Sequence, residues 1–76
     1  MLASQLMRRA YRLLFTFYPC RADGASTAFE VVELADDEAA LGRASRVLTD
    51  HPSAVTVVIW QGERQVGSVA REGAPA

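Results

Sequence analysis

Two residues of this chain, Cys20 and His51, have the side chains that nucleophilic catalysis by a thiol requires. That chemistry needs the base within hydrogen-bonding reach of the sulfur, and a third group that orients the base. Both residues fall in segments that we expect to be loops, and no third group stands in a pattern that would orient the histidine. We therefore interpret them as a loop cysteine and a surface histidine, and we predict a protein without enzymatic activity. Thiol chemistry at Cys20 stays as a remote alternative.

The sequence also lacks a pattern for binding metal ions or phosphate groups. One cysteine and one histidine at unrelated spacing do not resemble a zinc site. The acids Asp36, Asp37 and Glu38 are consecutive, and such acids at a helix start typically cap the helix and face the positive end of its dipole. The glycines are scattered, and none lies between a strand and a helix as in a phosphate-binding loop. We expect no metal, no cofactor and no small-molecule substrate.

Charge is unevenly distributed along the chain, although the formal net charge is only −1. The first 21 residues carry +4, from Arg8, Arg9, Arg12 and Arg21, whereas residues 22–50 hold seven acids and two arginines and sum to −5. A basic arm can contact nucleic-acid phosphates, so a weak nucleic-acid-binding accessory protein is an alternative function. No recognition motif accompanies the arm, and we prefer to interpret it as a charged, flexible segment.

The single cysteine excludes an internal disulfide, so the chain does not have the pattern of a disulfide-stapled secreted domain. Arg8 and Arg9 precede an apolar run that resembles the start of a signal peptide, but Arg12 interrupts this run and no small-residue cleavage site follows promptly. No stretch approaches the roughly 18 apolar residues of a membrane-spanning helix. We expect a soluble, cytoplasmic protein without membrane contact.

The length predicts a single domain with a small core. A domain of 76 residues buries only about 60% of its unfolded surface, which favours stabilisation by a partner. We expect residues 1–9 to form a flexible arm or a short helix, and residues 72–76 to be a frayed tail. Whether residues 1–6 belong to the natural protein is open, because Met7 is an alternative start.

The stretch Val55–Arg71 has the pattern of a β-hairpin and is the most definite element of the sequence. Two β-rich runs flank Gly62 and Glu63, and a glycine at the first position of a two-residue loop favours a type II′ turn. In that arrangement Gln61 lies opposite Arg64, and counting outward from this pair predicts the register of the two strands.

The predicted register divides the apolar side chains of the hairpin between two faces. One face holds Val55, Val57, Ile59, Val66, Ser68 and Ala70. The other holds Thr56, Val58, Trp60, Gln65, Gly67 and Val69. We expect the indole of Trp60 to lie across Gly67. Because both faces carry large apolar residues, the second face needs a cover in addition to the first.

Two further strands are predicted before the hairpin. Large side chains recur at alternate positions over Tyr11–Tyr18, which predicts a strand that Pro19 ends because proline cannot donate to a sheet. The following residues, to Ser26, are small and polar and predict a loop with a turn at the Asp-Gly pair. A second strand is expected over Thr27–Leu34.

A helix is predicted between the second strand and the hairpin. Asp36 can cap its free N–H groups, and Pro52 disfavours helical geometry at His51, so the helix should end by Asp50. The apolar positions recur at spacings of three and four and form one stripe, which consists of Ala40, Leu41, Ala44, Val47 and Leu48.

The order strand, strand, helix, strand, strand predicts an α+β fold. With the usual right-handed crossover it gives a ββαββ unit with a four-stranded antiparallel sheet of order 2-1-3-4 and the helix on one face. The face under the helix would hold Tyr11, Leu13, Phe15, Phe17, Phe29, Val31, Val55, Val57, Ile59 and Val66. The opposite face would hold Leu14, Tyr18, Val32, Leu34, Val58, Trp60 and Val69, and the chain has no second helix to cover it.

The sequence combines three motifs: an aromatic first strand, Y-R-L-L-F-T-F-Y, a helix start, D-D-E-A-A, and a hairpin, V-V-I-W-Q-G-E-R-Q-V. In these motifs it resembles a class of short, single-domain alphaproteobacterial proteins of unknown function. The resemblance covers residues 11–69 and departs in the N-terminal arm and in the Pro-Cys loop. It implies a bacterial protein, and it assigns no activity and no site residue.

The apolar face without a cover is the strongest functional signal of the sequence, because large exposed apolar patches usually mark a contact site. We therefore predict a small protein-interaction module that acts through the helix-free face of its sheet. It would act as a homodimer, by stacking faces or joining edge strands, or as an inhibitor or accessory subunit of a larger assembly. The contrary expectation is a monomer whose arm or arginine stems cover the face. The predicted protein-binding residues are Leu14, Tyr18, Val32, Val58, Trp60 and Val69.

Overall fold

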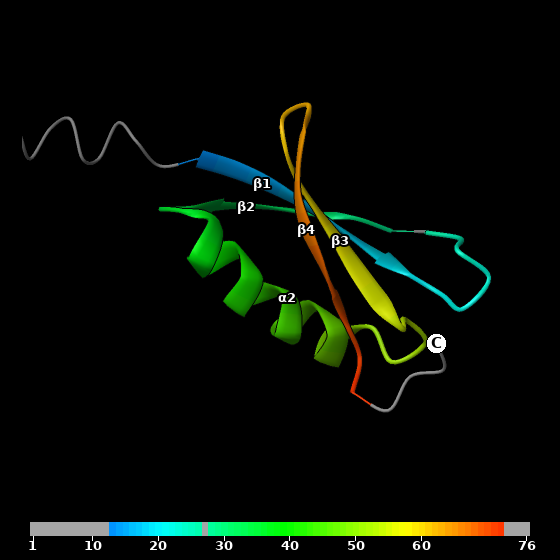
Figure 1. The fold of residues 1–76 in the computed structure, drawn as a ribbon. Helices are drawn as coiled ribbons and strands as arrows, with labels where there is room; N and C mark the ends of the chain where they lie inside the picture. Colours follow the sequence, from blue (N-terminus) through cyan, green and yellow to red (C-terminus); the bar gives the residue numbers. More distant parts are fainter. Residues whose placement is uncertain (1–12, 27, 73–76) are drawn as a thin grey trace, which may run out of the picture.

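The fold is a twisted antiparallel sheet with one helix along one of its faces (Figure 1). A computed structural model describes residues 13–26 and 28–72. The elements, in chain order, are β1 (Leu13–Cys20), β2 (Glu30–Leu34), α2 (Asp37–Asp50), β3 (Thr56–Gln61) and β4 (Arg64–Ala70). The strand order is β2-β1-β3-β4 and all neighbours are antiparallel, which confirms the predicted α+β class and sheet order. The predictions for residues 1–12, for Thr27 and for residues 73–76 lie outside the described residues.

The boundaries of α2 follow local chemistry, as predicted. The Asp36 side chain accepts a hydrogen bond from the Ala39 N–H at 2.9 Å, which satisfies one of the free donors of the first turn. The helix ends at Asp50, directly before His51 and Pro52. Among the described residues, no helix has the length and apolar character needed to cross a membrane.

The core lies between α2 and the sheet face beneath it, which we call the covered face. Five large side chains are fully buried there: Phe15, Phe17, Val47, Val57 and Ile59. Each such burial contributes about 1.5–3 kcal/mol relative to exposure, so this layer is the main source of stability. The predicted helix stripe is confirmed at Ala40, Ala44, Val47 and Leu48, whereas Leu41 is 42% exposed at its margin.

Strand β1 continues through Pro19 to Cys20, so the prediction that Pro19 ends the strand is wrong. Pro19 is buried and lies opposite Val57 of β3. Strand β2 pairs with β1 only as far as Phe17, so β1 has no neighbouring strand on that side at Pro19. A proline is tolerated there because the sheet needs no N–H donor on that side. The predicted turn follows: the Gly24 N–H donates to the Arg21 carbonyl oxygen at 2.8 Å.

Strand β2 faces the opposite way from the prediction. Phe15, which is buried, pairs with Val32, so Val32 and Leu34 pack against the core. Phe29 and Val31 are 64% and 52% exposed, and their predicted place under the helix is wrong. Both alternating sets of this strand are apolar, so the orientation is set by pairing with β1 and not by the pattern.

The hairpin turn has the predicted form. Gln61 pairs with Arg64, and Gly62 has a positive φ of 63°. No non-glycine residue in the described chain has a positive φ, so Glu63 does not have one. A type I′ turn would require positive φ at both central residues, and the observed angles therefore agree with type II′.

A β-bulge interrupts the hairpin two pairs from its turn. Trp60 pairs with Gln65, whereas its neighbour Ile59 pairs with Gly67, so Val66 is an extra residue in β4. Because side chains alternate with a period of two, one inserted residue moves every later side chain of β4 to the other face.

The bulge overturns the predicted positions of Gly67, Ser68, Val69 and Ala70. Ser68 and Ala70 pair with Val58 and Thr56 and lie on the face opposite α2. Val69 lies opposite Val57 and packs against the core, so it belongs to the covered face. A Cβ at Gly67 would come within 3.8 Å of the Leu41 side chain, so Gly67 also faces the helix. Trp60 therefore does not lie across Gly67.

Arginines at both ends of β4 hold the two ends of α2. After the strand, Arg71 donates hydrogen bonds to the carbonyl oxygens of Leu48, His51 and Ala54 at 2.6, 3.1 and 2.8 Å. The last turn of α2 contains no basic residue of its own, so this guanidinium supplies the positive charge that a helix C-terminus favours.

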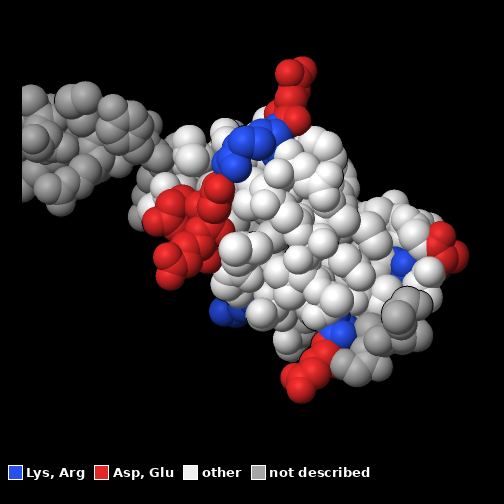
Figure 2. Space-filling model, viewed as in Figure 1, with Lys and Arg blue, Asp and Glu red and all other residues white. Residues whose placement is uncertain are grey.

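At the other end of α2, Arg64 donates two hydrogen bonds to Asp37, at 2.8 and 3.0 Å. These hydrogen bonds from the guanidinium lower the pKa of the Asp37 carboxyl and raise that of Arg64. Figure 2 shows the acidic side chains gathered over the start of the helix, next to a basic side chain of the hairpin. Strand β4 and α2 are thus connected at both ends by polar contacts.

Candidate interaction surface

The sheet face opposite α2, which we call the open face, is defined by the strand registers. On β1, the open-face residues alternate with the buried phenylalanines. On β2 and β3 they pair with these β1 residues, and on β4 they pair with the open-face residues of β3. The open face consists of Leu14, Thr16, Tyr18 and Cys20 on β1, Val31 and Glu33 on β2, Thr56, Val58 and Trp60 on β3, and Gln65, Ser68 and Ala70 on β4.

One side of the open face carries exposed apolar side chains, which we call the ridge: Leu14, Phe29 and Val31. Their exposed fractions are 60%, 64% and 52%, respectively. Phe29 precedes β2 and is held against Tyr18 of β1, with ring centroids 6.2 Å apart and planes tilted by 41°. This is a favourable aromatic geometry, and it holds the Phe29 ring of the ridge against the sheet.

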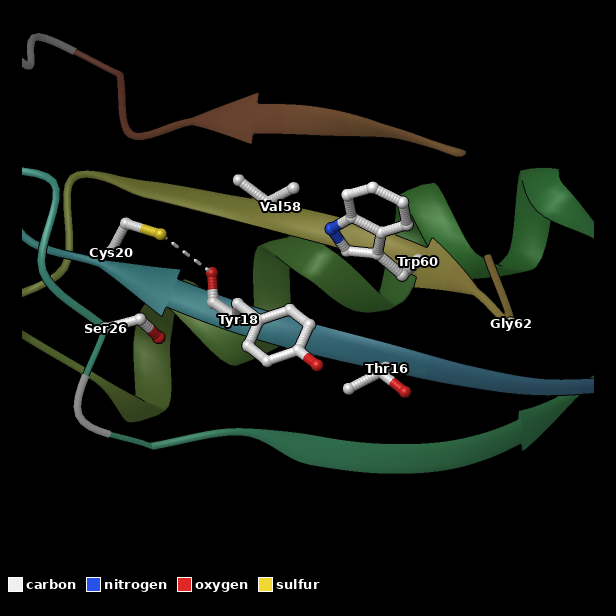
Figure 3. A pocket seen from close by; sticks show the side chains of 7 residues that line it. All are labelled: Thr16, Tyr18, Cys20, Ser26, Val58, Trp60 and Gly62. Atoms are coloured by element: carbon white, nitrogen blue, oxygen red, sulfur yellow. Dashed lines mark hydrogen bonds between the residues drawn. The ribbon is translucent and has the colours of Figure 1, made fainter. Parts of the chain in front are cut away.

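A shallow hollow of about 500 Å³ lies beside the ridge, over the centre of the sheet (Figure 3). It is lined by Thr16, Tyr18, Cys20, Ser26, Val58, Trp60 and Gly62. Figure 3 shows Val58 and Trp60 along β3 and Thr16 and Tyr18 along β1, with α2 behind the sheet. Val58 and Trp60 are half-buried and give the hollow an apolar floor, and the uncharged hydroxyl groups of Thr16, Tyr18 and Ser26 also line it.

Charge is nearly absent from the open face. Among the described open-face residues only Glu33, on the edge strand β2, is charged. The ion pairs among the described residues lie elsewhere: Arg64 with Asp37 at the helix start, Arg21 with Asp23, 3.5 Å apart, in the loop after β1, and Arg43 of α2 with Glu30 at the start of β2, 4.0 Å apart. The open face is therefore largely apolar and nearly uncharged, with its one acid on the edge strand β2.

The structure brings four of the six predicted binding residues together. Leu14, Tyr18, Val58 and Trp60 lie on the open face, within one continuous patch of β1 and β3. The other two, Val32 and Val69, pack against the core from the covered face.

Sequence reasoning missed Phe29 and Val31, the two most exposed members of the β2 side. One signal could have found them. Glu33 lies within the strand on the same face as Phe29 and Val31, and a charged side chain within a strand indicates the solvent-exposed face. Glu30 has a different position, because it begins the strand beside the end of α2. There Glu30 meets His51, with 3.1 Å between Oε2 and Nε2, and so it can remain on the covered side.

The structure does not bring Cys20 and His51 into contact. Cys20 lines the hollow on the open face, and its thiol donates to the Tyr18 carbonyl oxygen at 3.3 Å. His51 instead pairs with Glu30 beneath the helix end. Within residues 13–26 and 28–72, no group of three or more metal-binding side chains comes together.

The predicted basic arm is represented by one residue only. Arg8, Arg9 and Arg12 lie outside the described residues. Arg21 is exposed in the loop after β1 and pairs with Asp23, next to the turn. Nothing in this loop gathers further positive charge, so the described part of the chain adds no support to the nucleic-acid alternative.

Comparison of this chain with protein-family models, curated proteins and solved structures gives no match. The resemblance to short alphaproteobacterial proteins stays an interpretation of three sequence motifs.

Proposed function

We propose that this protein is a small, non-enzymatic interaction module that binds another protein through its open face. The partner is either a second copy or a larger assembly for which the protein serves as an inhibitor or an accessory subunit. The open face is the contact surface, and the covered face with α2 is the scaffold that holds the sheet together behind it.

The observation that carries the proposal is the concentration of exposed apolar side chains on one side of the molecule. Of the five large apolar residues with high exposure in the described chain, four border the open face: Leu14, Tyr18, Phe29 and Val31. Scattered exposed apolar residues need no explanation, but a contiguous patch costs solvation free energy that a partner removes.

The composition of the patch also fits protein recognition. Protein interfaces are enriched in tyrosine, tryptophan and phenylalanine and depleted of charge at their centre. The open face contains Tyr18 and Trp60, Phe29 borders it, and its centre on β1 and β3 is uncharged.

The test is the substitution Trp60→Arg, which places a charge in the hollow without touching the covered core. We expect it to weaken association with the partner by at least about tenfold, because a buried unpaired charge opposes docking. Association is measured as solution mass by sedimentation and as binding to protein from the native host in affinity capture. Circular dichroism verifies that the variant keeps its fold.

The matched control is Ser45→Arg, which adds the same side chain to the exposed surface of α2. We expect this control to behave as the unmodified chain. If Trp60→Arg and Ser45→Arg both leave the mass and the captured protein unchanged, the open face is not the contact surface and the proposal is wrong.

A further inference from the structure

We draw no further inference here: the strongest candidate, the open face of the sheet with its exposed ridge and the hollow beside it, is an unpartnered apolar surface, and nothing in the described part of the chain shows what covers it.

Discussion

Neighbouring side chains of β1 differ completely in their surroundings, although their types are similar. Phe15 and Phe17 are fully buried, whereas Leu14 and Tyr18, on the same strand, are 60% and 37% exposed. The two faces of the sheet are therefore not distinguished by apolar content. They differ because α2 covers only one of them, and a single helix cannot cover both.

The covered face is also held by polar contacts that the open face lacks. Arg64 and Arg71, at the two ends of β4, bind the two ends of α2. On the open face, the one side-chain hydrogen bond among the described residues of β1 is that of the Cys20 thiol with Tyr18. Stability thus comes mainly from the covered face, and the open face adds few side-chain hydrogen bonds that hold the fold.

The sharpest test of this difference is the pair Phe17→Ala and Leu14→Ala. Phe17→Ala removes a fully buried ring and leaves a cavity, so it should lower the free energy of unfolding by about 3–5 kcal/mol. A domain of this size has a total stability of only about 4–11 kcal/mol, so partial or complete unfolding is expected. Urea denaturation followed by circular dichroism measures the change.

Leu14→Ala removes a side chain of the same strand that is already 60% exposed. We expect its free energy of unfolding in dilute solution to change by less than about 1 kcal/mol. Comparable losses for the two substitutions would mean that the open face stabilises the fold as much as the covered face does, and the distinction between the faces would be wrong.

The next largest effect concerns the C-terminal end of α2. Arg71→Met keeps most of the apolar stem but removes the guanidinium hydrogen bonds to the carbonyl oxygens of Leu48, His51 and Ala54, of which the first two keep backbone N–H donors. We expect a loss of about 1–3 kcal/mol in the free energy of unfolding, because these groups are partly buried. Hydrogen exchange should show the greatest loss of protection in the last turn of α2.

The control for this substitution is Arg71→Lys, which keeps the charge but not the planar guanidinium that reaches three oxygens. Its loss should lie between those of the unmodified chain and Arg71→Met. Equal stability of Arg71→Met and the unmodified chain would show that α2 does not depend on this contact.

The smallest effect concerns the N-terminal end of α2 and depends on pH. Hydrogen bonds from Arg64 keep the pKa of Asp37 below its ordinary value of 3.8 in the folded state. Their contribution to stability is therefore complete above that value and is lost as the pH falls through the lower, folded-state pKa. Asp37→Asn should slightly lower the melting temperature at neutral pH, and the difference should vanish in acid.

Glu38→Gln is the matched control, because it removes an acid of the same helical turn for which no ion pair is found in the described chain. It reports the interaction with the helix dipole alone. A pH-dependent difference of the same size in both variants would mean that the Arg64 contact contributes nothing.

Local chemistry was sufficient to predict several features of the fold. The Asp36 cap and Pro52 set the ends of α2, and Gly62 set the hairpin turn. The alternation of β1 and the crossover rule then gave the sheet order. Each depends on neighbouring residues or on a general rule of chain handedness, so the sequence alone contains the information.

Other features were decided only by tertiary pairing. In β2, Val31 and Val32 are equally apolar, and pairing with β1 turned Val32 toward the core and left Val31 exposed. In β4, the bulge at Val66 transferred Val69 to the covered face. Where both faces of a strand carry apolar residues, the apolar pattern alone does not identify the inner face, because that choice is made by the packing against α2 and by the register of the whole sheet. In β2 only the position of Glu33 indicated the exposed face.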